Sequence, residues 1–243
     1  MDKSQRIHIG TSGWHYEHWR GPFYPAAMPP RNFLGFYAKH FETAEINSTF
    51  YGLPDRDVLT TWTELVPSDF VFAVKGSRYI THMKKLKDPE RTIGKFLERI
   101  EALGDKKGPI LFQLPPKWGL DIGRLRSFLD ALPKDERYAF EFRDPDWFGN
   151  ETEELLAKKG AAFCIYDFDE RQSPDSVTAD FVYIRLHGPD GAYQGNYSED
   201  SLSRWAKRIS SWEKEGKEVF CYFDNDENGY AAQNASTLDG LLR

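Results

Sequence analysis

Apolar and polar residues alternate along residues 181–188, whose sequence is FVYIRLHG. A period of two predicts a β-strand with two different faces. One face is apolar, and the other carries Arg185 and His187. A guanidinium and an imidazole that point into a protein need polar partners. We therefore expect other strands to supply acids or hydrogen-bond acceptors to this face.

Segments that resemble strands alternate with segments that resemble helices along the whole chain. Such alternation predicts a parallel sheet, and 243 residues suit a single TIM-like (β/α)8 barrel, complete or slightly irregular. We therefore predict one α/β domain over residues 1–243. The expected strands cover residues 7–11, 44–48, 70–75, 110–114, 138–143, 161–166, 181–188 and 219–223. The expected helices cover residues 32–40, 55–66, 88–104, 121–132, 151–159, 199–215 and 228–242.

Polar residues near the ends of the predicted strands alternate with apolar neighbours. In a TIM barrel the face opposite the helices points into the bore, and the C-terminal ends of the strands carry the active site. We therefore expect one concave site in which ionisable side chains from several strands meet. The alternative is an internal ion-pair network that only fills the bore. The cations are Lys75, Arg143 and Arg185, and the acids are Glu45, Glu141 and Asp224.

Three residues of this set are the predicted catalytic groups, namely Glu141, His187 and Asp224. Histidine titrates near neutral pH, so His187 can serve as a general acid or base, and the two acids can move protons or orient a water molecule. The alternative for His187 is a hydrogen-bonded residue that fixes the loop beginning at Gly188.

The three cations predict an anion site, because Lys and Arg bind phosphate and carboxylate groups and Arg does so with two parallel hydrogen bonds. The alternative is that the three acids neutralise all three cations. Aromatic residues in the neighbouring loops suit a nucleotide, a nucleobase or a sugar, or else form a lid that packs loops together. The predicted ligand-binding residues are Asn47, Lys75, Gln113, Arg143, Arg185, Tyr222, Asn225, Trp14 and Tyr193.

The composition limits the classes of molecule that we expect this protein to bind. The net charge of −6 provides no overall basic field for nucleic acid or membranes. Cys164 and Cys221 lie in apolar runs without a C-x-x-C motif, which indicates buried, reduced thiols in a cytoplasmic protein. The first residues lack the apolar core of a signal peptide, and no apolar run is long enough to cross a bilayer. We predict no metal ligands and no required cofactor, with a loosely held Mg²⁺ as a weaker alternative.

Eight motifs resemble those of the YecE-like family, also called domain of unknown function 72 (DUF72), over nearly the whole chain. The resemblance implies a TIM-like barrel and no established activity. Two positions depart from the pattern: residues 144–147 read DPDW where the family often has HPSW, and relatives vary between Asn and Asp at the position of Asp224. The motifs are IGTSGW (9–14), PFYP (22–25), EINSTFY (45–51), YITH (79–82), QLPP (113–116), EFR (141–143), RLHG (185–188) and YFDND (222–226).

Three functions fit these observations. The first is an enzyme, of hydrolase or lyase type, that acts on a phosphorylated or otherwise anionic small molecule. The second is a metal-assisted, nuclease-like protein that binds nucleic acid through a basic rim formed by Arg78, Lys84, Lys85 and Lys87. The third is a binding protein without catalytic activity. The sequence favours the first, because the predicted cations and acids meet at one end of the barrel.

Overall fold

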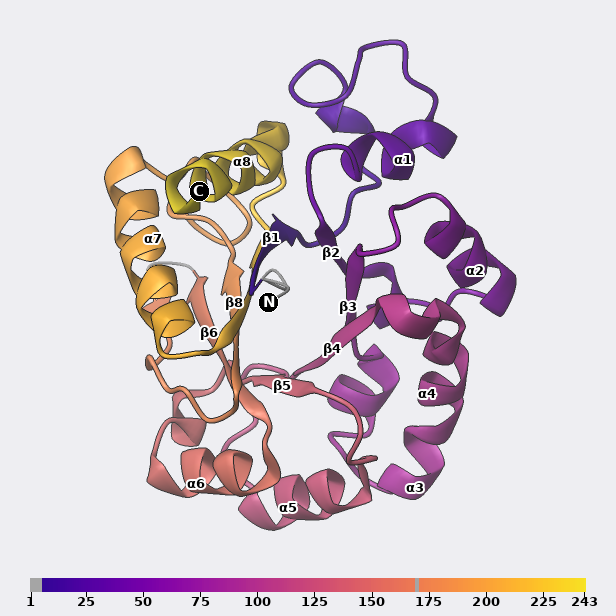
Figure 1. The fold of residues 1–243 in the computed structure, drawn as a ribbon. Helices are drawn as coiled ribbons and strands as arrows, with labels where there is room; N and C mark the ends of the chain where they lie inside the picture. Colours follow the sequence, from indigo (N-terminus) through magenta and orange to yellow (C-terminus); the bar gives the residue numbers. More distant parts are fainter. Residues whose placement is uncertain (1–5, 169–170) are drawn as a thin grey trace.

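Eight parallel strands form a nearly closed barrel in the computed structural model, which describes residues 6–168 and 171–243. The helices surround the strands (Figure 1), so the predicted TIM-like α/β fold is confirmed. The strand order is β1-β9-β8-β6-β5-β4-β3-β2, and the short β7 (Arg171–Gln172) pairs antiparallel with β6. The barrel strands are β1 (Ile7–Thr11), β2 (Thr43–Ile46), β3 (Val71–Lys75), β4 (Lys107–Gln113), β5 (Tyr138–Glu141), β6 (Ala162–Phe168), β8 (Phe181–Leu186) and β9 (Glu218–Phe223).

The helices lie near the predicted ranges, with one clear difference. The single helix expected over residues 88–104 is broken into pieces, because Gly104 has non-helical backbone angles and Ile93 separates two short helices. The described helices are α1 (Phe33–Tyr37), α2 (Arg56–Glu64), α3 (Pro89–Thr92), α4 (Gly94–Ile100), α5 (Ile122–Ala131), α6 (Asn150–Lys159), α7 (Glu199–Lys214) and α8 (Tyr230–Leu242).

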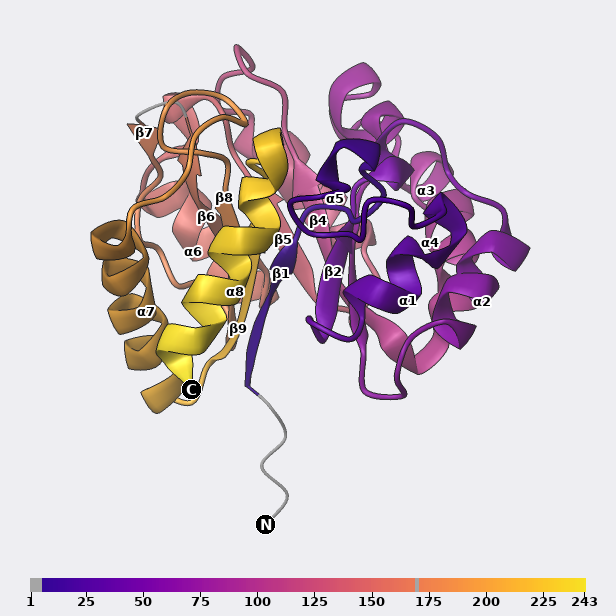
Figure 2. The same ribbon diagram turned by 90° about the horizontal axis from the view of Figure 1, so that it is seen from above.

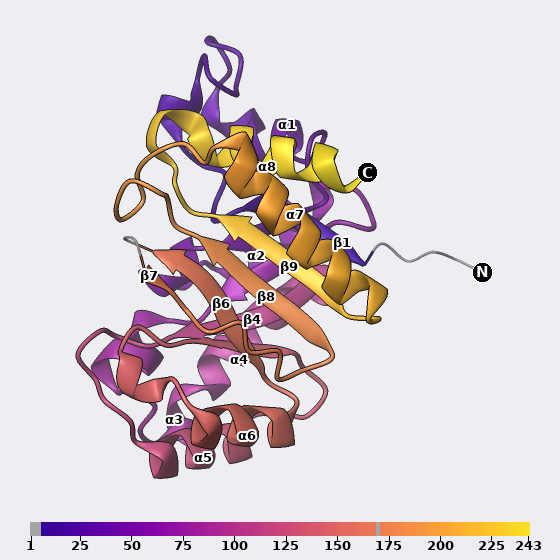
Figure 3. The same cartoon turned by 90° about the vertical axis from the view of Figure 1, so that its left-hand side faces the viewer.

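The core has two layers. The larger layer lies between the strands and the helices, and α7 contributes Leu202, Trp205 and Ile209 to it from one face. Figure 3 shows α7 and α8 lying over the outer face of β8 and β9. The smaller layer fills the lower bore with small and aromatic side chains that include Ala139, Cys164 and Phe220. A filled lower bore leaves the C-terminal ends of the strands as the polar end of the barrel.

The barrel closes between β1 and β2 through a side chain instead of a continuous backbone ladder. The hydroxyl of Tyr37 accepts a hydrogen bond from the backbone nitrogen of Thr11 (2.9 Å) and donates one to the carbonyl of Thr43 (2.9 Å). Gly10 makes this approach possible, because a Cβ atom there would lie 2.3 Å from the carbonyl oxygen of Thr43. Figure 2 shows β1 beside α8 at this seam.

Two strands end earlier than predicted. β2 ends at Ile46 and the chain turns into a short 3₁₀-helix (Ser48–Phe50), and β5 ends at Glu141. Thr49 does not continue the bore-facing row of β2, because its hydroxyl donates to the carbonyl of Ile46 (2.9 Å) and to that of Lys75 (2.6 Å). These bonds tie the turn after β2 to the end of β3.

Both cysteines are free and buried, as predicted. None of the helices within residues 6–168 and 171–243 combines the length and the apolarity needed to span a bilayer.

Candidate functional site

A fully buried guanidinium lies at the centre of the polar end of the barrel. Arg185 on β8 donates to Glu45 on β2 (2.8 Å), to Glu141 on β5 (2.9 Å) and to Asp224 after β9 (2.9 Å). It also donates to the hydroxyl of Ser12 (3.0 Å). Carboxylates from three strands therefore converge on one cation, as the shared strand faces predicted. We call Arg185 with these acids, Ser12, Tyr183 and His187 the Arg185 network.

The acids of the network are held in the ionised form. Burial alone would raise the pKa of Glu141, but Arg143 and Arg185 outweigh it and hold that pKa well below its usual value. For Asp224, burial is again opposed by Arg185 and by the hydrogen bond from His187, and the pKa falls to about 2. Ser12 and Tyr183 donate further hydrogen bonds to Glu45, the latter at 2.7 Å. Buried charges are stable only when their hydrogen-bonding positions are occupied in this way.

His187 connects the Arg185 network to Arg143. Its Nδ1 lies 3.0 Å from Asp224, and its Nε2 lies 2.9 Å from a terminal nitrogen of Arg143. A guanidinium only donates and a carboxylate only accepts, so Nδ1 carries the proton and Nε2 accepts. His187 is fully buried. Its hydrogen-bonding capacity is therefore used within the protein, and its Nε2 is not directed at solvent.

Arg143 lies at the upper edge of the network and faces a cavity. Its Nε donates to Glu141, and its guanidinium stacks 3.9 Å from the centre of the Phe168 ring. It lines a cavity of about 210 Å³, together with Gln113, Tyr166, Phe168, Arg171 and Tyr193. The other terminal nitrogen of Arg143, Nη1, has no hydrogen-bond partner among the described residues. We call this space the polar cavity.

Lys75 and Gln113 lie next to Arg143 along the mouth of the barrel. The three residues lie at the ends of the consecutive strands β3, β4 and β5, and we call them the donor row. Both Lys75 and Gln113 are buried, at 5% and 9% exposure. Within the part of the chain that the structure describes, neither side chain has a hydrogen bond or ion pair. The Lys75 ammonium instead lies 4.5 Å from the centre of the Phe50 ring.

The charge of Lys75 is poorly stabilised. Burial lowers its pKa first, and the positive charge of Arg185 lowers it further, so that the nearby acids restore it only in part and the pKa is about 8. Arg185 has taken up the direct bonds of those acids. Arg185 is therefore neutralised by direct contact with the acids, whereas Lys75 is attracted to the same acids only over longer distances.

Several predicted ligand-binding residues do not face the polar cavity. Arg185 is fully buried and bonded to three carboxylates, and it is not among the residues that line the cavity; its direct contact with an anion stays a prediction. Tyr222 lies deeper in the bore, with its hydroxyl 2.7 Å from that of Thr43. Asn225 points the opposite way, because successive residues of an extended strand end face opposite sides, and it donates to Gly195 (2.8 Å) and Asn234 (2.9 Å).

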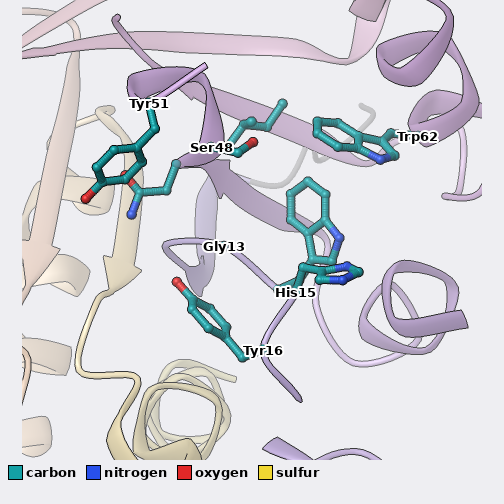
Figure 4. A pocket seen from close by; sticks show the side chains of 9 residues that line it. Gly13, His15, Tyr16, Ser48, Tyr51 and Trp62 are labelled. Atoms are coloured by element: carbon teal, nitrogen blue, oxygen red, sulfur yellow. The ribbon is translucent and has the colours of Figure 1, made fainter. Parts of the chain in front are cut away.

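Trp14 and Asn47 line a second cavity, of about 430 Å³, beside the seam between β1 and β2. Trp14 packs edge-on against Trp62, with ring centres 5.0 Å apart, and a buried Oδ1 of Asn47 has no hydrogen-bond partner. Figure 4 shows Tyr16, Tyr51 and Trp62 arranged around this space, which we call the aromatic cavity. The predicted packing of the first aromatic loop also occurs, since Trp19 and Tyr24 are buried.

Sequence reasoning missed His82 as a site residue, although it ends the YITH motif. It lies on a short π-helix (Tyr79–Met83) after β3, and its ring meets Phe50 with centres 5.0 Å apart. Burial, followed by the charges of Lys75 and Arg78, lowers the pKa of His82 to about 4. The signal in the sequence was its position in a loop directly after the strand that carries Lys75.

Of the residues named for a basic rim, Arg78 directly precedes this π-helix and the three lysines follow it. The ammonium groups of Lys84 and Lys85 lie over the rings of Tyr79 and Trp118, at 5.7 and 5.8 Å from the ring centres. No group of three or more His, Cys, Asp or Glu side chains within residues 6–168 and 171–243 is arranged to hold a metal ion.

Comparison with known proteins identifies the family to which this chain belongs. The sequence pattern described as "Protein of unknown function DUF72" matches residues 8–243. The chain belongs to the DUF72 family. This membership agrees with the resemblance drawn from the eight motifs.

Other DUF72 relatives agree in sequence and in fold. The protein YecE of Escherichia coli is 32% identical over 155 residues, which are 63% of this chain and 54% of YecE, so the matched segment spans about half of that relative. YunF of Bacillus subtilis is 24% identical over 97% of this chain and 94% of its own. The crystal structure of a DUF72 family protein from Thermotoga maritima superimposes with a TM-score of 0.90, at 28% identity, over 98% of this chain and 99% of that one.

Proposed function

We propose that this protein binds a small anionic ligand, carrying a phosphate or carboxylate group, at the mouth of its barrel, and that it is an enzyme acting on that ligand. The observation that carries the proposal is the donor row: Lys75, Gln113 and Arg143 lie on neighbouring strands with hydrogen-bond donors that the described residues do not use. These donors retain some contact with solvent at the mouth of the barrel, so an arrangement that keeps three of them together favours a ligand that supplies the acceptors.

The contacts of Arg143 support the choice of an anion. Its Nε and one terminal nitrogen are held by Glu141 and His187, and its flat face lies on Phe168. The guanidinium is thereby fixed in orientation while Nη1 remains available beside the polar cavity. A fixed guanidinium loses little entropy when it binds an oxyanion. Arg171 and the half-exposed Tyr193 at the same cavity suit the entrance of a charged, partly planar molecule.

The predicted catalytic residues take positioning roles in this proposal. Asp224 accepts from His187, which fixes the tautomer in which Nε2 accepts from Arg143. Glu141 holds the same guanidinium from the other side. Because His187 is fully buried, its contacts favour orientation of Arg143 over direct proton transfer to a ligand.

Calorimetry with inorganic phosphate and with pyruvate tests the proposal. We expect binding in the unmodified protein and a rise in its melting temperature, since a ligand that binds only the folded state stabilises it. Arg143→Lys keeps the charge but loses the planar donor pair, and we expect affinity to fall about tenfold, the loss of one charged hydrogen bond. Arg31→Met, at an exposed arginine that is not among the residues lining either cavity, removes a full charge and should leave affinity unchanged.

Absence of binding by every anion tested would overturn the proposal. Equal loss of affinity in Arg31→Met and Arg143→Lys would also overturn it, because the attraction would then arise from overall charge and not from the donor row.

A further inference from the structure

Lys75 has the surroundings of a reactive amine. Its side chain is 5% exposed, and its ammonium rests on the Phe50 ring without a hydrogen bond or ion pair to any described residue. A structural lysine at this depth is ordinarily paired with an acid. Here the three nearby acids are bonded to Arg185 instead. Lysines become nucleophiles when they are desolvated or placed near another cation, and both conditions hold for Lys75.

Lys75 is not among the residues that line either cavity, but it lies on a strand between them. β3 lies between β2, after which Asn47 lines the aromatic cavity, and β4, on which Gln113 lines the polar cavity. Lys75 therefore sits between the two cavities in the strand order, beside the groups proposed to hold an anion. A molecule whose anionic group lies at Arg143 would bring its neighbouring atoms toward the amine.

His82 supplies a proton carrier on the same side. Lys75 and His82 both lie against the Phe50 ring, at 4.5 and 5.0 Å from its centre, and His82 is half-buried on a π-helix. Isolated π-helical turns occur frequently at functional sites. The lowered pKa of His82, about 4, leaves its imidazole neutral at neutral pH.

We infer that Lys75 forms an imine with an aldehyde or ketone substrate that also carries a phosphate or carboxylate group, an inference that rests on the proposed function. The nitrogen lone pair forms the bond to the carbonyl carbon. The two hydrogens of the neutral amine leave with the carbonyl oxygen as water, and the resulting C=N group takes up one proton. His82 moves protons between the nitrogen and the departing oxygen. An iminium withdraws electrons from the adjacent carbon, which favours the lyase class over hydrolysis.

Borohydride trapping tests this inference on the full chain. The protein is incubated with glyoxylate, an aldehyde that carries a carboxylate, and then reduced, so that hydride addition converts the imine to a stable secondary amine. Peptide mapping by mass spectrometry then locates the label. At neutral pH an amine with a pKa of about 8 is neutral roughly a hundredfold more often than an ordinary lysine. We expect Lys75 to be labelled at least about tenfold faster than exposed lysines such as Lys85, after allowance for its restricted access.

The pH dependence of the labelling rate provides a second test. The charged groups that face Lys75 are Arg185, Asp224, Glu45 and Glu141, with His82 on the adjoining π-helix. Labelling of Lys75 should reach half its maximal rate near pH 8, whereas a lysine with the ordinary pKa reaches it only above pH 10. Lys75→Met should abolish the fast labelling and Lys85→Met should not. Uniform labelling of all lysines, or a half-maximal rate near pH 10 for Lys75, would overturn the inference.

Two outcomes separate this inference from the proposed function. Binding of phosphate or pyruvate without selective labelling of Lys75 would overturn the imine and leave anion binding intact. Selective labelling by the uncharged glycolaldehyde, at the same rate as by glyoxylate and unchanged in Arg143→Lys, would support the reactive amine and count against the anion site.

Discussion

Two groups of charged residues share the polar end of this barrel and differ in one respect. In the Arg185 network every acid bonds to the central guanidinium, and Ser12 and Tyr183 satisfy remaining acceptor positions. In the donor row, Lys75 and Gln113 have no polar partner within the described residues. The acids of the first group find their partners within the protein, and the second group offers the donors to which we propose that a ligand binds.

The difference shows that charge at a barrel mouth is not enough to identify a binding residue. Arg185 and Lys75 are both buried cations at strand ends. Arg185 bonds to three acids and leaves only its buried Nε without a partner, whereas the ammonium of Lys75 has no polar partner among the described residues. A saturated cluster stabilises the position of its neighbours, and an unsaturated one lowers the stability of the empty protein in favour of a ligand. Removing members of each group should therefore have opposite effects on stability.

The largest effect is expected for Arg185→Met. The substitution leaves three buried carboxylates without their shared cation, and breaking a buried ion cluster in this way costs about 3–5 kcal/mol. Urea denaturation measures the change. Arg124→Met, which removes a partly exposed ion pair with Asp121 at the start of α5, should cost less than about 1 kcal/mol. If both variants lost a similar, small amount of stability, the Arg185 network would not be a major source of stability.

Lys75→Met should act in the opposite direction. The pKa of Lys75 is about 8 in the folded state against 10.5 for the free side chain, so the unfolded chain binds more protons between these values and stability rises with pH across this window. Below pH 8 the charged amine therefore costs roughly 3 kcal/mol, from about 1.4 kcal/mol per pKa unit.

We expect Lys75→Met to gain most of this amount at pH 7 and little above pH 10.5. Denaturation at several pH values measures the gain, with Lys85→Met as the matched exposed control. A variant that is less stable than the unmodified protein at pH 7 would contradict the view that Lys75 is an uncompensated charge.

Acid should weaken the Arg185 network before it affects the donor row. The pKa of Asp224 is about 2 in the folded state against 3.8 ordinarily, so its contribution is complete above pH 3.8 and is lost as pH falls toward 2. The loss is about 2 kcal/mol. Asp224→Asn should lose less stability across this window than the unmodified protein, as measured by thermal denaturation. If the stability of the two proteins fell in parallel with pH, the loss in acid would come from groups other than Asp224.

The smallest effects come from a pair of substitutions that remove one polar group each. Tyr183→Phe deletes the 2.7 Å bond to Glu45 and should cost about 1–3 kcal/mol, because the acceptor is charged and buried. Gln113→Leu removes a buried amide that has no polar partner in the described chain, and should be neutral or stabilising by up to about 1 kcal/mol. Phosphate affinity should nevertheless fall in Gln113→Leu. The same sign of stability change in both variants would remove the distinction between the two groups.

Much of this site could be predicted from alternation along the strands. The shared faces of β2, β5 and β8 brought Glu45, Glu141 and Arg185 together as expected, because period two fixes which side chains enter the bore. The pairing among them could not be predicted. Whether Arg185 or Lys75 takes the acids depends on distances across the barrel, which local sequence does not encode.

Errors arose where a strand ended. The strand predicted over residues 44–48 ends at Ile46, and the chain then turns into a 3₁₀-helix. Asn225 was grouped with Asp224, although neighbouring residues of an extended segment face opposite sides. His82 was missed because π-helical geometry has no hydrophobic period that a sequence reveals.

The seam between β1 and β2 gives the aromatic cavity a different mechanical character from the polar cavity. Most of the barrel wall is held by backbone ladders, whereas at Gly10 the hydroxyl of Tyr37 bridges the two strands. Trp14 and Asn47 follow these same two strands. A backbone hydrogen bond from Gly13 to Glu45 adds to the Tyr37 bridge, so the wall of this cavity is joined by few bonds, whereas the strands beside the polar cavity are joined by backbone ladders.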